Sequence, residues 1–170
     1  MVCLRFFSHW ALAMLLVVIV GCSKGEDTKY PPLSLDRSSA CSVCGMILLD
    51  FPGPKAQIIY TNNRHDFFCG TLDLFTFYLQ PDSPKNIAAI YVNDMGKEDW
   101  SKPTGHWIEA RSAFLVYGGE VRGAMGDVLV PFSVEGQAND YIKKYRGKPV
   151  GFNDVNMEML RPFMTGHHKK

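Results

Sequence analysis

The same order of predicted secondary-structure elements occurs twice along the chain, and this repetition limits the folds that the chain can adopt. Short apolar runs between proline- and glycine-containing turns indicate strands, and a capping residue before a longer segment indicates a helix. Each half gives the order strand, strand, helix, strand. We therefore predict an α+β fold of two tandem ββαβ units in one compact domain, with halves at 40–96 and 106–156 joined by a polar loop at 97–105.

The first half contains two apolar runs on either side of a Pro-Gly-Pro turn. A helix is expected to begin at Thr71, as the N-cap, and to end before Pro81, because proline cannot continue a helix. The predicted elements are strands at 46–49 and 56–60, a further strand at 65–69, a helix at 71–80 and a strand at 87–92.

The second half follows the same order. Ser133 is the predicted N-cap of a helix that ends at Tyr145. Residues 157–170 contain methionines and paired histidines and are predicted to be a flexible C-terminal tail. The predicted strands are one within 108–117, one at 128–132 and a closing strand at 149–152.

The N-terminal 21 residues have the pattern of an export signal. Arg5 precedes an apolar run of about 15 residues, below the roughly 18 to 20 needed to span a bilayer. Residues 19–22 are similar to a bacterial lipobox, so Cys22 is the predicted lipidation site, with palmitate in the anchor, and residues 22–39 the predicted flexible tether. The alternatives are an ordinary signal peptide and a short membrane anchor. Ser23 favours the outer membrane by analogy, with the domain facing the periplasm.

Charge and cysteine counts exclude some classes of function. The chain has 18 basic and 17 acidic residues, and loss of Arg5 with the signal leaves 17 of each. A neutral mature chain has no global field for nucleic acid. Of five cysteines, Cys3 leaves with the signal and Cys22 is assigned to lipid, which leaves Cys41, Cys44 and Cys69. An odd number favours a metal site over a disulfide framework.

The stretch from Cys41 to Met46 places two thiols and a thioether within six residues. Such soft ligands favour Cu(I), zinc or iron–sulfur clusters over hard cations. In the second half, Met125 lies in a Gly-Ala-Met-Gly loop, and it could reach the same ion if the two halves pack face to face. The alternatives are a short-loop disulfide between Cys41 and Cys44 and simple packing of Met125 against its neighbours.

Several ordered motifs resemble the NosL family of copper-chaperone lipoproteins. They extend over about residues 41 to 155 and are Cys41-x-x-Cys44-Gly45-Met46, Gly53-Pro54-Lys55-Ala56-Gln57-Ile58, Tyr91-Val92-Asn93-Asp94, Ala113-Phe114-Leu115-Val116, Gly123-Ala124-Met125-Gly126 and Val130-Pro131-Phe132. The resemblance implies a fold related to organomercurial lyase and Cu(I) delivery to the copper centre of nitrous oxide reductase, an enzyme of denitrification, with a membrane transporter complex as further partner. It also implies Cu(I) ligands at Cys44, Met46 and Met125, and optionally Cys41. Ala124 stands where the family usually has proline.

The predicted ligand set suits a carrier of copper. One thiolate and two thioethers make a Cu(I) site of zero net charge, which can lie in a partly apolar groove. Two or three ligands also leave room for a partner's ligand, so copper can pass by exchange. A closed tetrahedral site would instead hold the metal structurally.

Two other functions stay open. Cys41, Cys44, His65 and Cys69 have the spacing of a tetrahedral zinc site, although His65 alone is more typical of a surface or core histidine and Cys69 of a small buried residue. A thiol–disulfide oxidoreductase would need Cys41 at a helix N-terminus, and a turn is expected there instead. No catalytic constellation is present in the sequence, so we expect a non-enzyme. Oxidation of Cys41 and Cys44 could gate copper binding.

Overall fold

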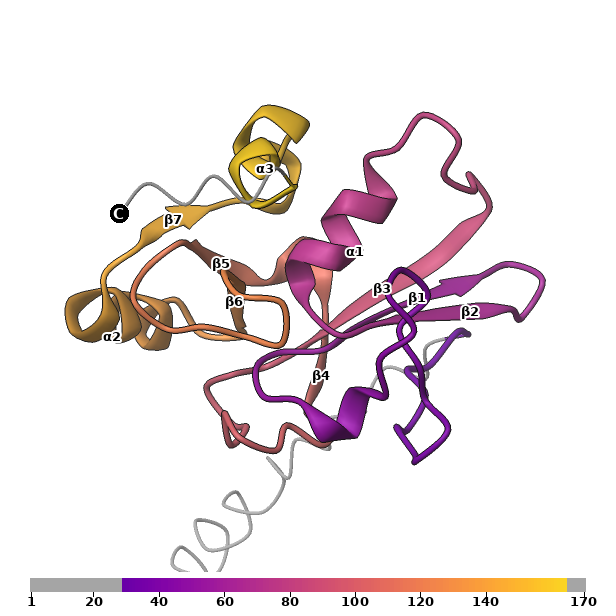
Figure 1. The fold of residues 1–170 in the computed structure, drawn as a ribbon, viewed down its shortest axis with the longest axis horizontal. Helices are drawn as coiled ribbons and strands as arrows, with labels where there is room; N and C mark the ends of the chain where they lie inside the picture. Colours follow the sequence, from indigo (N-terminus) through magenta and orange to yellow (C-terminus); the bar gives the residue numbers. More distant parts are fainter. Residues whose placement is uncertain (1–28, 165–170) are drawn as a thin grey trace, which may run out of the picture.

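The structure, a computed structural model, describes residues 29–164 and contains two antiparallel sheets and three α-helices (Figure 1). The sheets have the strand orders β2-β1-β3-β4 and β6-β5-β7. Each sheet contains one ββαβ unit, β1-β2-α1-β3 and β5-β6-α2-β7, so the predicted α+β fold is confirmed. The predicted signal segment and Cys22 lie outside the described residues. Within them, no helix has the length and apolar character to cross a bilayer.

The first sheet is built around β1 (Ala56–Tyr60), all of whose residues are buried. It pairs with β2 (His65–Phe68) and β3 (Ile87–Asn93), and β4 (Trp107–Glu109) adds to the outer edge of β3. Complete burial of β1 requires cover on both faces of the sheet. Helix α1 (Thr71–Tyr78) and the second half cover one face with the main core, and the N-terminal segment covers the other.

This N-terminal segment differs from the flexible tether predicted at 22–39. The Gln57 side chain accepts a hydrogen bond from the Leu33 backbone N–H (2.8 Å) and donates one to the Leu33 carbonyl (3.1 Å). The Tyr91 hydroxyl donates to the Tyr30 carbonyl (2.8 Å). From Tyr30 onward the chain is therefore part of the folded domain, because buried polar groups of the sheet need these backbone partners.

The second sheet is built around β5 (Phe114–Tyr117), which lies between β6 (Leu129–Phe132) and β7 (Lys148–Val150). Pro131 and Pro149 lie in the two edge strands, where a missing backbone donor is tolerated. Helix α2 (Glu135–Tyr145) packs on this sheet. Helix α3 (Met157–Met164) contacts α1 and buries Leu160 completely, so the predicted tail begins with a packed helix (Figure 1).

Three predicted strand boundaries are wrong for local reasons. Residues 46–49 form only a bridge at Ile47 and then a 3-10 turn, Leu48–Asp50. A second 3-10 turn, Ala110–Ser112, divides the strand predicted within 108–117, because the Glu109 carboxylate accepts from the Arg111 N–H and ends β4. The closing strand ends at Val150, before the 3-10 turn Phe152–Asp154.

Both predicted helix caps are also wrong. The N-cap of α1 is Gly70, and the Thr71 hydroxyl instead donates to the Leu129 carbonyl in the second half. The N-cap of α2 is Val134, and the Ser133 hydroxyl donates to the Asp94 carboxylate. Both hydroxyls therefore join the two halves, where local sequence rules predict only a local role.

The two halves share one core and one polar junction. The main cluster of buried residues includes Ile58 and Phe68 of the first sheet and Leu115 and Leu129 of the second. The junction is centred on Asp94, whose side chain is fully buried. The halves consequently form a single packing unit, and a loop of one half has a fixed place against the other.

Candidate metal centre

The first structural part of the site is a closed loop from Cys41 to Met46. The Cys41 N–H donates to the Met46 carbonyl (2.9 Å), and the Gly45 N–H donates to the Cys41 carbonyl (2.8 Å). Gly45 has a φ of +75°, which glycine adopts at little cost. A bridge between Ala40 and Ile47 closes the base of the loop. The six residues therefore form a tight turn, and the helix that an oxidoreductase would require after Cys41 is not formed there.

A second set of contacts fixes this loop beside β2. The Ser42 N–H donates to the Phe67 carbonyl (2.8 Å), and Cys41 forms a parallel bridge with Phe67. The Ser42 hydroxyl donates to Asp66 (2.9 Å), and the other oxygen of that carboxylate accepts from the Tyr60 hydroxyl (2.6 Å). Because Cys69 directly follows β2, this docking brings it next to the loop.

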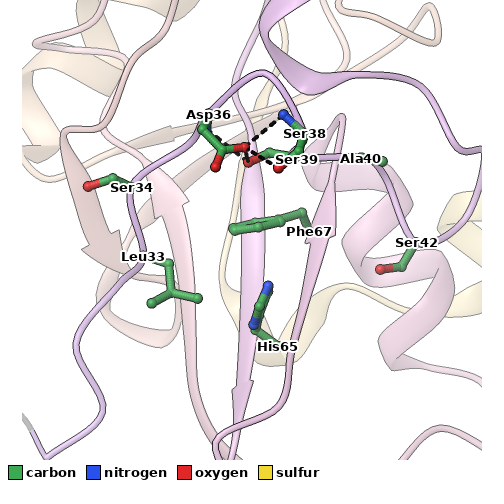
Figure 2. A pocket seen from close by; sticks show the side chains of 9 residues that line it. All are labelled: Leu33, Ser34, Asp36, Ser38, Ser39, Ala40, Ser42, His65 and Phe67. Atoms are coloured by element: carbon green, nitrogen blue, oxygen red, sulfur yellow. Dashed lines mark hydrogen bonds between the residues drawn. The ribbon is translucent and has the colours of Figure 1, made fainter.

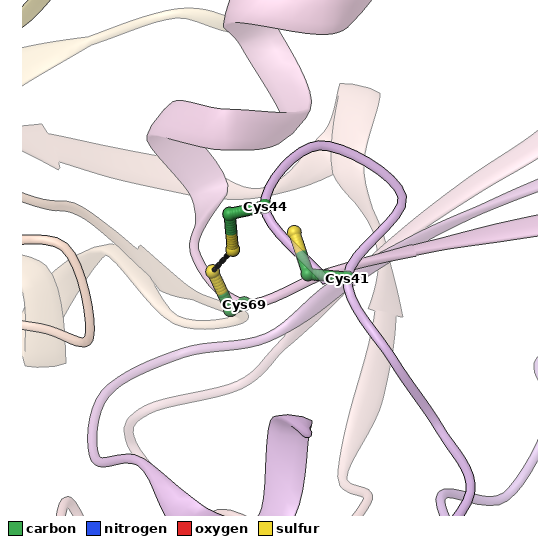
Figure 3. Close-up of side chains that lie close together, drawn as sticks. All are labelled: Cys41, Cys44 and Cys69. Atoms are coloured by element: carbon green, nitrogen blue, oxygen red, sulfur yellow. Dashed lines mark hydrogen bonds between the residues drawn. The ribbon is translucent and has the colours of Figure 1, made fainter. Parts of the chain in front are cut away.

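The result is a cluster of three thiols, Cys41, Cys44 and Cys69, whose sulfur atoms all lie within 4.8 Å of one another (Figure 3). The Sγ atoms of Cys44 and Cys69 are 3.4 Å apart. Cys69 is completely buried and Cys41 is 3% exposed, whereas Cys44 is exposed. The cluster thus has two buried thiols and one that solvent or a partner can reach. Sequence reasoning gave Cys69 too little weight, although its position after a strand next to the Cys-x-x-Cys loop was a usable signal.

The surroundings shift the pKa values of the two buried thiols, Cys41 and Cys69, in opposite directions. The interaction with Cys69 lowers the pKa of the Cys41 thiol, with help from backbone N–H groups of the loop. The same interaction, together with burial, raises the pKa of Cys69. Burial also raises the pKa of Asp73, which accepts from Cys69 Sγ (3.5 Å), to about 6. The surroundings therefore favour the thiolate form at Cys41, and the thiolate is the form that binds a soft metal.

The two predicted methionine ligands lie at the border of the cluster. Met46 is half-buried and packs against an apolar cluster that contains two of the thiols, formed by Cys41, Leu48, Phe67 and Cys69. In the loop of the second half, Ala124 packs against the same cluster, while the adjacent Met125 is 56% exposed. The loop is closed by a hydrogen bond from the Gly123 N–H to the Gly126 carbonyl (2.7 Å). The structure therefore brings the loop of Met125 to the thiols and leaves its thioether in solvent.

The backbone contact that holds this loop in place requires glycine. A Cβ atom on Gly53, whose φ is +81°, would lie 3.0 Å from the Cα of Gly123. The turn before β1 and the loop of Met125 therefore touch backbone to backbone.

His65 lies away from the thiols. It is exposed at the start of β2, with its ring 4.9 Å from that of Phe67. Both rings line a pocket of about 540 Å³ between β2 and the segment 33–42, where Asp36 accepts hydrogen bonds from Ser38 and Ser39 (Figure 2). The three cysteines do not line this pocket. Within the described residues, the predicted zinc set is thus assembled in its three cysteines only.

We predict that mild oxidation of the metal-free protein links Cys44 to Cys69, whose sulfur atoms are in contact, with two protons and two electrons passing to the oxidant. Trypsin cleavage after Arg37, Lys55 and Arg64 puts Cys41 and Cys44 on one peptide and Cys69 on another. Mass spectrometry should therefore find a cross-linked peptide pair, and Cys41→Ser should retain it. A disulfide confined to the first peptide would contradict the prediction and favour Cys41–Cys44 instead.

Fold and site together define a class: a small two-sheet α+β domain with a candidate soft-metal centre, in which one exposed thiol lies beside two buried ones. Residues 32–160 match the NosL family, and the chain belongs to that family. The resemblance found in the sequence motifs is thereby confirmed.

Named relatives agree with this assignment. The copper-binding lipoprotein NosL of Stutzerimonas stutzeri is 35% identical over 161 residues, which cover 92% of this chain and 84% of the relative. That of Achromobacter cycloclastes is 33% identical, with 91% and 83% covered. The crystal structure of the copper chaperone NosL from Shewanella denitrificans has a TM-score of 0.73 and 35% identity, covering 76% of this chain and 98% of that one.

Proposed function

We propose that this protein is a lipid-anchored, periplasm-facing carrier that binds Cu(I) and delivers it for assembly of the copper centre of nitrous oxide reductase. The observation that carries the proposal is the cluster of three thiols with one exposed member, in a chain whose relatives are copper-binding lipoproteins. The cluster supports a soft metal. The names of the relatives favour copper among soft metals.

The proposed ligands are Cys44, Met46 and Met125, with Cys41 as a further thiolate. Thiolates and thioethers are the ligands that Cu(I) prefers. Met46 packs against the apolar cluster that contains Cys41 and Cys69, and so does Ala124, whose neighbour Met125 would have to turn inward from solvent. Cys69 is a further proposed donor, because its sulfur atom lies within 4.8 Å of those of Cys41 and Cys44.

Delivery is supported by the unequal exposure of the thiols. A ligand of the partner can approach an ion held at Cys44 from the solvent side. Cys41 and Cys69 are buried, so solvent and partners do not reach them. The incoming ligand can bind before the last bond to this protein breaks, so no free copper ion is released. Both exposed donors, Cys44 and Met125, belong to loops, which can adapt to a partner more easily than the sheets.

Localisation and partners are part of the proposal. Lipid on Cys22 would hold the domain at the membrane, with the outer membrane favoured over the inner. Proposed partners are nitrous oxide reductase and its membrane copper transporter complex, and a purely carrying role needs no catalysis.

A zinc-stabilised structural site is the competing proposal. The observation in its favour is that three thiols already converge, as they would in a tetrahedral site with one more ligand. The histidine expected to complete such a set lies in a different pocket.

The deciding experiment is deletion of the gene in its host, followed by isolation of nitrous oxide reductase and measurement of its copper content. We expect the reductase to be copper-deficient and to regain copper when the wild-type gene is restored. Cys44→Ser should not restore it, whereas Val43→Ser, which changes the exposed neighbour, should. Full copper content in the deletion strain would mean that the copper goes to another recipient.

A further inference from the structure

Lys55 is the most unusual charged residue of the domain. Its side chain is fully buried, although lysine is rarely buried at all. The ammonium donates to three consecutive backbone carbonyls, those of Phe51 (2.8 Å), Pro52 (3.0 Å) and Gly53 (2.8 Å). These bonds satisfy all three of its donors but do not neutralise its charge. The domain thus holds a positive charge in its interior.

This cation lies beside the thiol cluster. Strands β1 and β2 pair Ala56 with Phe68, so the same antiparallel register places Lys55 next to Cys69, just beyond the strand ends. Burial lowers the pKa of Lys55 to about 8, and the nearby Asp73 carboxylate acts in the opposite direction. Three carbonyl acceptors require three N–H donors, which only the charged ammonium supplies, and the strand register places this residue beside Cys69 of the cluster.

A fixed positive charge has two effects on a neighbouring metal site. It stabilises thiolates, and this effect helps any soft metal bound through the same sulfur atoms. It also repels the metal ion in proportion to the charge of that ion, so a divalent ion is penalised twice as much as a monovalent one. With the sulfur ligands unchanged, the net consequence is discrimination by metal charge.

We propose that Lys55 sets the preference of the thiol cluster for monovalent Cu(I) over divalent ions such as Zn(II). The inference rests on the proposed copper function. It adds to the proposed site a residue, Lys55, that does not itself contact the metal. In a medium of effective dielectric constant about 20, one unit of charge anywhere within about 12 Å of the ion changes the ratio of affinities by roughly tenfold or more. Lys55 therefore acts through the field at the site and not through coordination.

The test compares Cu(I) and Zn(II) affinities of the mature lipoprotein in detergent at pH 7, each measured by competition with a chelator for that metal. Lys55→Met and Lys55→Gln remove the charge, and the amide of the second can still donate to the carbonyls. Both should raise the Zn(II) affinity relative to that for Cu(I) by roughly tenfold. Lys55→Arg keeps the charge and should leave the ratio unchanged. Lys143→Met removes an equal charge from an exposed site on α2 and should do the same.

The outcomes separate the possible explanations. If the ratio of Zn(II) to Cu(I) affinity is unchanged in the neutral variants, Lys55 does not have the proposed role. The proposal also fails if Lys55→Arg shifts the ratio as much as the neutral variants do, because the shift would then come from the altered hydrogen bonds to the carbonyls and not from the charge. Thermal unfolding shows which variants are folded, and either neutral variant suffices. If the wild-type protein binds no Cu(I), the proposed copper function fails. If it binds Cu(I) and only the ratio stays constant, this inference alone fails.

Discussion

Cys44→Ser is expected to weaken Cu(I) binding by more than about 100-fold. Changing a residue that only supports a metal ligand lowers affinity by up to about 100-fold, and loss of a ligand itself should cost more. The hydroxyl of serine is a hard, neutral donor and cannot replace a thiolate at Cu(I). Because Cys44 is exposed, the substitution should not alter folding. Affinity is measured by competition with a Cu(I) chelator under reducing conditions.

Met125→Leu tests whether the second half contributes to the same ion. Leucine keeps the size of the side chain and removes the thioether, so affinity should fall while stability is preserved. Met159→Leu, in helix α3, is the matched control and should bind copper as the wild type does. Wild-type affinity in Met125→Leu would restrict the site to the first half. Tightly bound zinc that survives Met125→Leu and is lost in Cys44→Ser would make the cluster structural.

Asp94→Ala is expected to lower the free energy of unfolding by about 3 kcal/mol, because hydrogen bonds to a buried carboxylate contribute about 1.5 to 3 kcal/mol each and are not fully additive. The carboxylate accepts from the Ser133 N–H and from the Gly96 N–H, both at 3.1 Å, and from the Ser133 hydroxyl. It also pairs with the Lys97 ammonium (3.1 Å). Its removal leaves donors of both halves without an acceptor. Denaturant unfolding measures the change.

The contribution of Asp94 to stability should fall as the pH is lowered. Burial alone would raise the pKa of Asp94, but the hydrogen bonds from Ser133, Lys97 and Gly96 lower it below 3.8. Its contribution is therefore complete above about pH 4 and is lost as the pH falls through the lowered pKa. The difference in stability between wild type and Asp94→Ala should shrink in that acid range. Asp140→Ala, at an exposed ion pair, should change little at any pH, and an equal loss there would contradict the role of Asp94.

The fold was predictable from the sequence where local pattern and tertiary environment agree. The apolar run of β1 and the segment of α2 are in the predicted places. The run at 46–49 is as apolar as a strand, yet it forms only a bridge from Ile47 to Ala40 and then a 3-10 turn. The division at Ala110–Ser112 was not predictable, because it depends on which of two sheets lies next to each part of an apparently continuous strand.

The candidate site was predictable in its chemistry and less so in its composition. The Cys-x-x-Cys loop and the soft-metal preference followed from residue types alone. The place of Cys69 in the cluster depends on the contact between Ser42 and Phe67, which no sequence rule gives. Lys55 was recognised only as part of a family motif, since burial of a lysine and its three carbonyl partners is decided by the turn that surrounds it.

Because Tyr30 and Leu33 contact the first sheet, only a short segment of chain separates the domain from the proposed lipid anchor. From Cys22 to Tyr30 is eight residues along the chain, which span less than about 30 Å even when fully extended. With lipid on Cys22, the domain would remain within a thin layer above the bilayer surface. A copper donor embedded in the same membrane would be met by lateral diffusion in two dimensions, whereas a recipient free in solution would have to come to that layer to be loaded.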